Sequence, residues 1–118
     1  MTGDPIIDAL ESTTAFKVYA DCENYPDVEF EIMLDTLPSM EQAELAVRTL
    51  DNFVNRYNKW HFFRPIHYVS GLEDCREGNH PWGIYVFIDF GGSSPKALLE
   101  AVRALESTDL PIVRLTLR

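Results

Sequence analysis

Residues 27–36 read DVEFEIMLDT, and the alternation in this segment decides the fold. Apolar residues occupy every second position, at Val28, Phe30, Ile32 and Leu34, and mostly acidic residues fill the positions between them. Because successive side chains of a strand point to opposite faces, this pattern predicts a strand with one apolar and one acidic face. It is the clearest strand pattern in the chain.

A long helix is predicted directly after this strand. Ser39, which follows Pro38, is a favourable N-cap, and Gln42 completes a capping-box pattern three residues later. Apolar residues then recur at i, i+3, i+4 and i+7 over about five turns. They form one stripe that is expected to face the core: Ala43, Ala46, Val47, Leu50, Phe53, Val54 and Tyr57.

Weaker patterns place the elements on either side of this pair. Residues 15–21 predict a strand, and the apolar run within residues 1–13 predicts either a brief helix or a loose arm. Residues 61–69 predict a further strand. Pro65 lacks an amide proton, so this strand is expected at a sheet edge or a bulge.

The C-terminal part predicts a loop, a strand, a helix and a last strand. Residues 70–81 are polar, whereas residues 82–90 are apolar nearly throughout, which is typical of a central strand covered on both faces. The turn at residues 91–95 supplies Ser94 as an N-cap and a proline at the first helical position. Residues 112–117 form the final strand. The second helix is marked by Leu98, Leu99, Val102 and Leu105.

This order of elements predicts an α+β fold. From Asp27 onward the order is βαββαβ, which favours a ferredoxin-like two-layer sandwich with an additional N-terminal strand. If the additional strand pairs with residues 27–36 as a hairpin, it competes with the final strand for the same neighbour, so the strand order stays open. With 118 residues and 46% hydrophobic content, the chain is expected to form a single domain over residues 1–118, with residues 1–13 as a loosely attached arm.

Negative charge is concentrated in the first 45 residues. This segment holds eleven of the nineteen acidic residues and one base, Lys17, while the other 73 residues hold eight acids and nine bases. The net charge of −9 therefore belongs to one third of the chain. Such a field attracts cationic partners and repels nucleic acid and anionic membranes.

The acidic residues define the candidate binding site. Carboxylates on residues 27–35 project to solvent from one face of the strand, with alternate residues about 6.5–7 Å apart. The predicted partner-binding surface comprises Asp21, Glu23, Asp27, Glu29, Glu31, Asp35, Glu41 and Glu44. A plainer interpretation is a solvated face that aids solubility and discourages edge pairing. Both interpretations stay open at this point.

The sequence gives weaker support to a metal site or a catalytic site. His61, His67, His80, Cys22 and Cys75 are zinc-ligand types, but no pair has the short spacing that preorganises a metal site. A Cys75–His80 nucleophile would need a walled pocket and oxyanion donors, which proximity in sequence does not supply. We expect no enzymatic activity, no metal, no cofactor and no disulfide.

Two further motifs have structural explanations. Gly91–Pro95 could bind phosphate at a helix start, but every capped helix offers that geometry, and an ordinary turn is favoured. The aromatic run at residues 60–63, with Tyr68 and Tyr85, could stack RNA bases. That role requires basic surface beside the rings, so we assign these aromatics to core and edge packing. The sequence has no signal-peptide pattern and no apolar run of about 18 residues, so a cytoplasmic location is expected.

In size, charge and clustered acids from Asp21 to Glu44, the chain resembles small acidic bacterial toxin-immunity proteins. It also looks similar to phage-encoded acidic inhibitors that imitate nucleic acid. Both resemblances imply a stoichiometric complex, with no cofactor, that blocks the cleft of a basic partner such as a nuclease-type toxin. The charge asymmetry predicts that neither nucleic acid nor a membrane is a partner. The alternative is a ferredoxin-like regulatory or assembly domain that forms a homodimer and binds a small ligand between its subunits.

Overall fold

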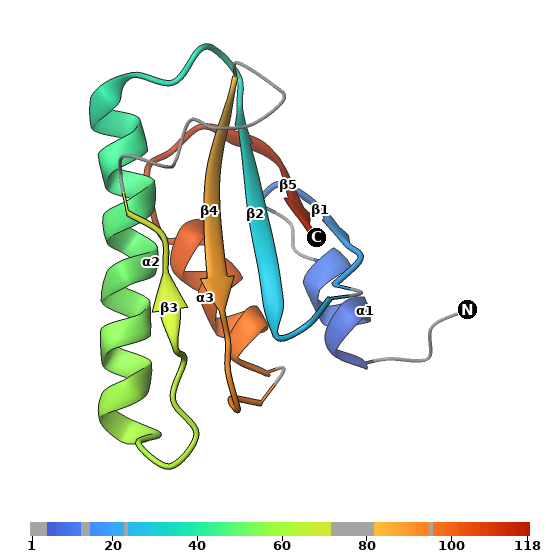
Figure 1. Ribbon diagram of the computed structural model, residues 1–118. Helices are drawn as coiled ribbons and strands as arrows, with labels where there is room; N and C mark the ends of the chain where they lie inside the picture. Colours follow the sequence, from blue (N-terminus) through green and yellow to red (C-terminus); the bar gives the residue numbers. More distant parts are fainter. Residues whose placement is uncertain (1–4, 13–14, 23, 72–81, 95) are drawn as a thin grey trace.

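The computed structural model describes residues 5–12, 15–22, 24–71, 82–94 and 96–118. These residues form an α+β fold with a five-stranded mixed sheet and three helices (Figure 1). The elements are α1 (Pro5–Glu11), β1 (Lys17–Ala20), β2 (Asp27–Leu34), α2 (Met40–Trp60), β3 (Tyr68–Val69), β4 (Gly83–Asp89), α3 (Lys96–Glu106) and β5 (Ile112–Leu117). The strand order is β1-β5-β2-β4-β3, in which β1 and β5 are parallel and the other neighbours antiparallel.

Strand β2 lies in the middle of the sheet and has the predicted alternation. Its apolar residues Val28, Phe30, Ile32 and Leu34 are essentially inaccessible to solvent and belong to one hydrophobic core. The strand pairs with β4 on one side and β5 on the other. The competition for this position is therefore settled in favour of the final strand, and β1 pairs with the outer edge of β5.

The helix α2 begins as the capping-box pattern predicts. Ser39 Oγ accepts a hydrogen bond from the Gln42 amide at 3.1 Å, and Gln42 Oε1 accepts one from the Ser39 amide at 2.9 Å. Its predicted stripe packs into the core, where Val47 is half-buried and the other six residues are buried. Reciprocal capping satisfies two amide groups that the helix itself leaves without partners.

All three helices lie on the same side of the sheet. In Figure 1 the strands β2 and β4 pass in front of α3, which contacts both α2 and α1. Of the two alternatives for the N-terminal segment, the brief helix is present, and Leu10 of α1 is fully buried in the core. Within the described residues no helix packs on the opposite side, which we call the helix-free face.

Two predicted strands differ from expectation. The strand predicted at residues 61–69 is only two residues long, because the Asn58 side chain bonds both the amide and the carbonyl of Ile66 and ties this segment to the end of α2. It does lie at a sheet edge. The apolar strand β4 was expected at the sheet centre with both faces covered, but it lies next to the central strand β2, and helices cover one of its faces. On its other face, side chains of the neighbouring strands bury Tyr85.

In the part of the chain that the structure describes, no helix combines the length and the apolar character needed to cross a bilayer.

Candidate functional site

The helix-free face carries the acidic side of β2 together with residues from its neighbours. These residues alternate with core residues on their own strands, so their side chains point away from the helices. The face is formed by Lys17 and Tyr19 of β1, Arg114 and Thr116 of β5, Asp27, Glu29, Glu31 and Met33 of β2, Tyr85, Phe87 and Asp89 of β4, and Tyr68 of β3.

Carboxylates gather at one end of this face. Asp27 is directly opposite Asp89 in the β2–β4 register, and Glu29 is the next residue along on the same face. Asp21 lies at the same end, because its amide donates to the carbonyl of Leu117, the last residue of β5. We call Asp21, Asp27, Glu29 and Asp89 the acidic corner.

The two facing carboxylates of the acidic corner differ in how they are held. Asp89 Oδ1 accepts a hydrogen bond from the Gly91 amide at 2.9 Å, and Oδ2 lies 3.9 Å from His67 Nδ1. Asp27 is exposed, and its carboxylate has no hydrogen bond or ion pair with any described residue. Like charges directly opposite each other destabilise a strand pair. The register therefore sets two like charges at facing positions here.

Glu31 departs from the prediction that the β2 carboxylates all project to solvent. It is only 5% exposed. The Tyr85 hydroxyl donates to Glu31 Oε2 at 3.0 Å, and Arg118 Nη2 lies 3.5 Å from Oε1. Arg118 also places Nη1 3.9 Å from Glu29. Glu31 is thus part of an internal polar cluster, because Tyr85 and Arg118 close over it from the two neighbouring strands.

The face is also not uniformly negative. Lys17 and Arg114 are partners in the β1–β5 register, and Arg114 is opposite Met33 of β2. These bases lie toward the end of the sheet where β2 finishes, away from the acidic corner. The helix-free face consequently has a mainly acidic end, where Arg118 pairs with Glu29, and a basic end.

The remaining predicted site residues lie elsewhere. Asp35 is exposed just beyond the far end of β2. Glu41 and Glu44 are exposed on α2, in the helix layer, because the turn after β2 carries the chain to the other side of the sheet. Glu23 lies outside the described residues. The structure therefore brings together Asp21, Asp27 and Glu29 but not the whole predicted set.

The predicted site does not include Asp89. This residue lies within residues 82–90, which are apolar nearly throughout and predict a strand covered on both faces. Its position opposite Asp27 depends on antiparallel pairing between segments about 60 residues apart, at one register of several possible ones. Alternation within residues 82–90 would have put Asp89 on the face of Tyr85 and Phe87, but not beside Asp27.

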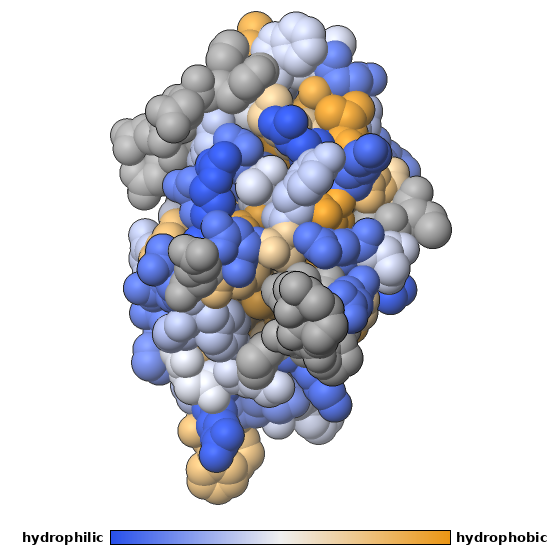
Figure 2. All heavy atoms as spheres, turned by 90° about the vertical axis from the view of Figure 1, so that its right-hand side faces the viewer, coloured by the Kyte–Doolittle hydropathy of each residue, from blue (hydrophilic) through white to orange (hydrophobic). Residues whose placement is uncertain are grey.

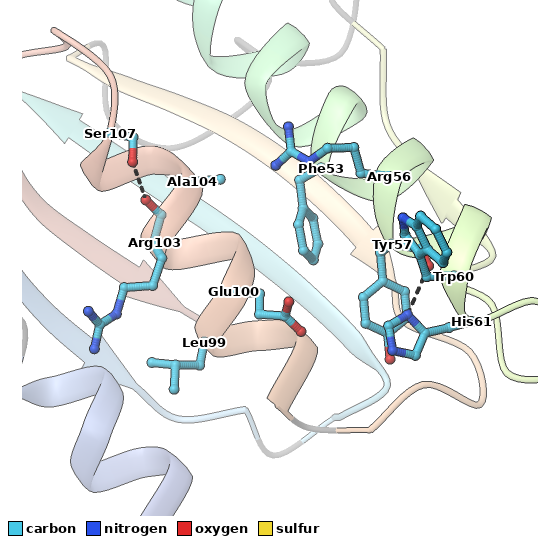
Figure 3. A pocket seen from close by; sticks show the side chains of 10 residues that line it. All are labelled: Phe53, Arg56, Tyr57, Trp60, His61, Leu99, Glu100, Arg103, Ala104 and Ser107. Carbon is cyan, nitrogen blue, oxygen red and sulfur yellow. Dashed lines mark hydrogen bonds between the residues drawn. The ribbon is translucent and has the colours of Figure 1, made fainter.

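A second surface lies at the end of α2. Trp60, Phe62 and Phe63 are 77%, 70% and 87% exposed, so assigning them to core and edge packing was wrong. Figure 2 shows hydrophobic side chains protruding at the lower end of the molecule, where the α2–β3 connection lies in Figure 1. A groove of about 670 Å³ between α2 and α3 opens beside Trp60 (Figure 3).

The candidate zinc ligands and the glycine turn have local structural partners. His61 stacks on the Tyr57 ring at a centroid distance of 3.9 Å. Gly91 has a φ of +56°, and a side chain there would collide with the His67 ring, so a glycine is needed at this turn. Among the described residues no three His, Cys, Asp or Glu side chains gather as metal ligands. Cys75 and His80 lie outside those residues, so the predicted absence of a disulfide stays a prediction.

No family model, curated protein or solved structure matches this chain.

Proposed function

We propose that this chain is a non-enzymatic acidic binding protein whose acidic corner holds a basic protein partner. The class of partner that fits best is a nuclease-type toxin, which makes the chain an immunity protein acting in the cytoplasm without a cofactor. The observation that carries this proposal is the facing pair Asp27 and Asp89, in which Asp27 has no partner among the described residues.

A cationic partner would relieve the repulsion between these two carboxylates. A Lys or Arg side chain placed between them gains two attractive contacts, whereas the free protein bears one repulsive contact. Asp89 is already oriented by the Gly91 amide, so little ordering is needed on binding. A nuclease cleft presents such cations because it binds phosphates, and carboxylates can occupy the same positions.

Aromatic residues beside the acidic corner suit the same role. Tyr68 is half-exposed and Phe87 is more than a third exposed, with ring centroids 6.3 Å apart. Both flank Asp89, since Tyr68 is its partner on β3 and Phe87 precedes it by two residues on β4. Aromatic side chains are enriched among the residues that dominate binding energy. The corner thus combines charge with apolar contact area.

A homodimeric regulatory or assembly domain is the second candidate. The separation of charge on the helix-free face favours it, because a twofold-related copy could place its acidic end over Lys17 and Arg114. Edge pairing is less suited, since the edge strands β1 and β3 have four and two residues. The protein is accordingly expected to be a monomer or a homodimer.

We further propose that the part from β2 to β5 is a ferredoxin-like unit to which α1 and β1 are added. The antiparallel pairings in the order β5-β2-β4-β3 support this assignment. An experimental structure with a different order for these four strands would contradict it.

The test is a titration against the product of the adjacent gene. The double variant Asp27→Lys/Glu29→Lys is expected to weaken the complex at least tenfold, about 1.4 kcal/mol. Glu41→Lys/Glu44→Lys makes the same change in net charge in the helix layer and is the matched control, which should change affinity far less. Higher salt should slow association of the wild type, because screening shortens the range of the charge attraction.

Three results would count against the proposal. Equal weakening by both double variants would mean that net charge alone is recognised. Unchanged affinity of the Asp27/Glu29 variant would place the interface elsewhere. A stable homodimer that the same variant dissociates would favour the regulatory domain.

A further inference from the structure

The groove between α2 and α3 has an apolar floor. Phe53 points from α2 into the space between the two helices, and Leu99 and Ala104 of α3 also line the groove (Figure 3). A second hollow of about 300 Å³ shares Tyr57, Trp60 and His61 with this groove and is also lined by Phe62 and Phe63. The two hollows adjoin at the shared residues and are open rather than enclosed, and together we call them the depression.

The charge around this depression is opposite to that of the protein. Residues 52–72 contain no acid in a chain that has nineteen, and they include Arg56, Lys59 and Arg64. Arg56 extends from α2 above Phe53 and makes no ion pair with any described residue. Among the described residues that line the groove, Glu100 is the one acid, beside Arg56 and Arg103; Arg103 Nε lies 3.5 Å from Glu106 Oε1.

Three large aromatic side chains at the mouth of the depression are exposed to solvent and make few contacts within the described protein. Trp60, Phe62 and Phe63 occupy consecutive or nearly consecutive positions, and the rings of Phe62 and Phe63 are 4.4 Å apart. Contiguous exposed apolar surface beside charged residues is characteristic of interaction sites. Trp and Arg are also two of the residue types most enriched where interfaces derive their affinity.

We propose that this depression is a docking site for an acidic protein segment that carries large apolar anchor residues. The anchors fill the apolar floor beside Phe53, and acidic side chains of the segment pair with Arg56 and Arg64, which line the depression. The site is independent of the acidic corner, which takes partners of the opposite charge.

Shape and charge favour a polypeptide segment over other anionic occupants. A groove between two helices matches an amphipathic segment with anchors on successive turns. Single-stranded nucleic acid could stack on the aromatic rings, but the net charge of −9 repels a polyphosphate over its whole length. A short acidic segment meets only the local positive charge.

The probe is a fluorescein-labelled helical peptide of about four turns. It has Phe and Leu anchors at i, i+4 and i+7 and Glu at most other positions, and a companion peptide has Lys in place of Glu. We expect the Lys peptide to bind at the acidic corner, so that Arg56→Glu does not weaken its binding. For the Glu peptide, Arg56→Glu and Trp60→Ala should each weaken binding by about fivefold or more, and Glu100→Lys should strengthen it.

Two variants serve as matched controls. Arg48→Glu reverses an exposed charge on the same helix outside the groove, and Leu37→Ala removes an exposed apolar side chain elsewhere. Both should leave peptide affinity unchanged. Urea unfolding of every variant identifies any that fails to fold, and the gain expected for Glu100→Lys does not depend on a loss of structure.

Three outcomes would overturn the proposal. The first is affinity for the Glu peptide that Arg56→Glu and Glu100→Lys do not change. The second is tighter binding of a single-stranded oligouridylate than of the Glu peptide. The third is self-association of the wild type that Trp60→Ala abolishes, since a second copy would then occupy the groove.

Discussion

Replacing Asp27 by asparagine should stabilise the protein while weakening its complex with a basic partner. Asp27 faces Asp89 across the β2–β4 pair, where Cβ atoms of directly opposed residues are about 4.5–5.5 Å apart. Two charges about 6 Å apart repel by about 0.7 kcal/mol in water, and salt at 0.15 M reduces this by about half. The expected gain in the free energy of unfolding is therefore about 0.3–0.7 kcal/mol, or about 1–3 °C in Tm.

The assay is urea unfolding of wild type and Asp27→Asn at low and high salt. The gain should be largest at low salt and disappear near 1 M, where the Debye length is about 3 Å. Glu41→Gln is the matched control, because Glu41 lies in the first turn of α2 and its charge favours the helix dipole. This control should lose about 0.3–1 kcal/mol. A loss of stability in Asp27→Asn, or a gain independent of salt, would refute the repulsion argument.

Other predictions address the core, the polar cluster, pH and metal content. Phe53→Ala should cost about 3–5 kcal/mol in urea unfolding, since Phe53 is buried between α2 and α3; a loss below about 1 kcal/mol would mean that the stripe does not face the core. Tyr85→Phe should cost about 1–3 kcal/mol, because Glu31 loses its hydroxyl donor; a neutral result would show that Arg118 is a sufficient partner. Burial raises the pKa of Tyr25, whose hydroxyl donates to the Ser93 carbonyl at 2.9 Å, so the folded state favours the neutral phenol. That contribution is complete below about pH 10 and is lost as the pH rises through the folded-state pKa. The difference in unfolding free energy between wild type and Tyr25→Phe should narrow above pH 10, and a constant difference would contradict this. Elemental analysis of protein purified without chelator should find no stoichiometric zinc.

The periodic parts of the fold could be predicted from the sequence. The alternation in β2 and the capping box of α2 involve neighbouring residues, and local patterns carry that information. The short β3 could not be predicted in the same way, because the two bonds from Asn58 to Ile66 form only once α2 ends beside that residue. Side-chain contacts of this kind override the strand propensity of residues 61–69.

The candidate site could be predicted only where it depends on residues that are close in the sequence. Asp27 and Glu29 share a face because they are two residues apart, which alternation predicts. The burial of Glu31 depends on Tyr85 and Arg118, which arrive from strands far away in the sequence. Such neighbours are fixed by the strand order and register, which the alternation of one strand does not determine.

The place of β5 between β1 and β2 has a consequence for the order of events during synthesis. Among the described strands, β1 is paired with β5, and β2 has one edge unpaired until β5 is made. Until residues 112–117 leave the ribosome, the early strands β1 and β2 are close in sequence and free to form the local hairpin that the native sheet does not contain. Charged side chains discourage strands from associating at an open edge. The carboxylates of β2 are therefore expected to protect the nascent chain before they serve any partner, and substituting them should lower the yield of folded protein more than its equilibrium stability.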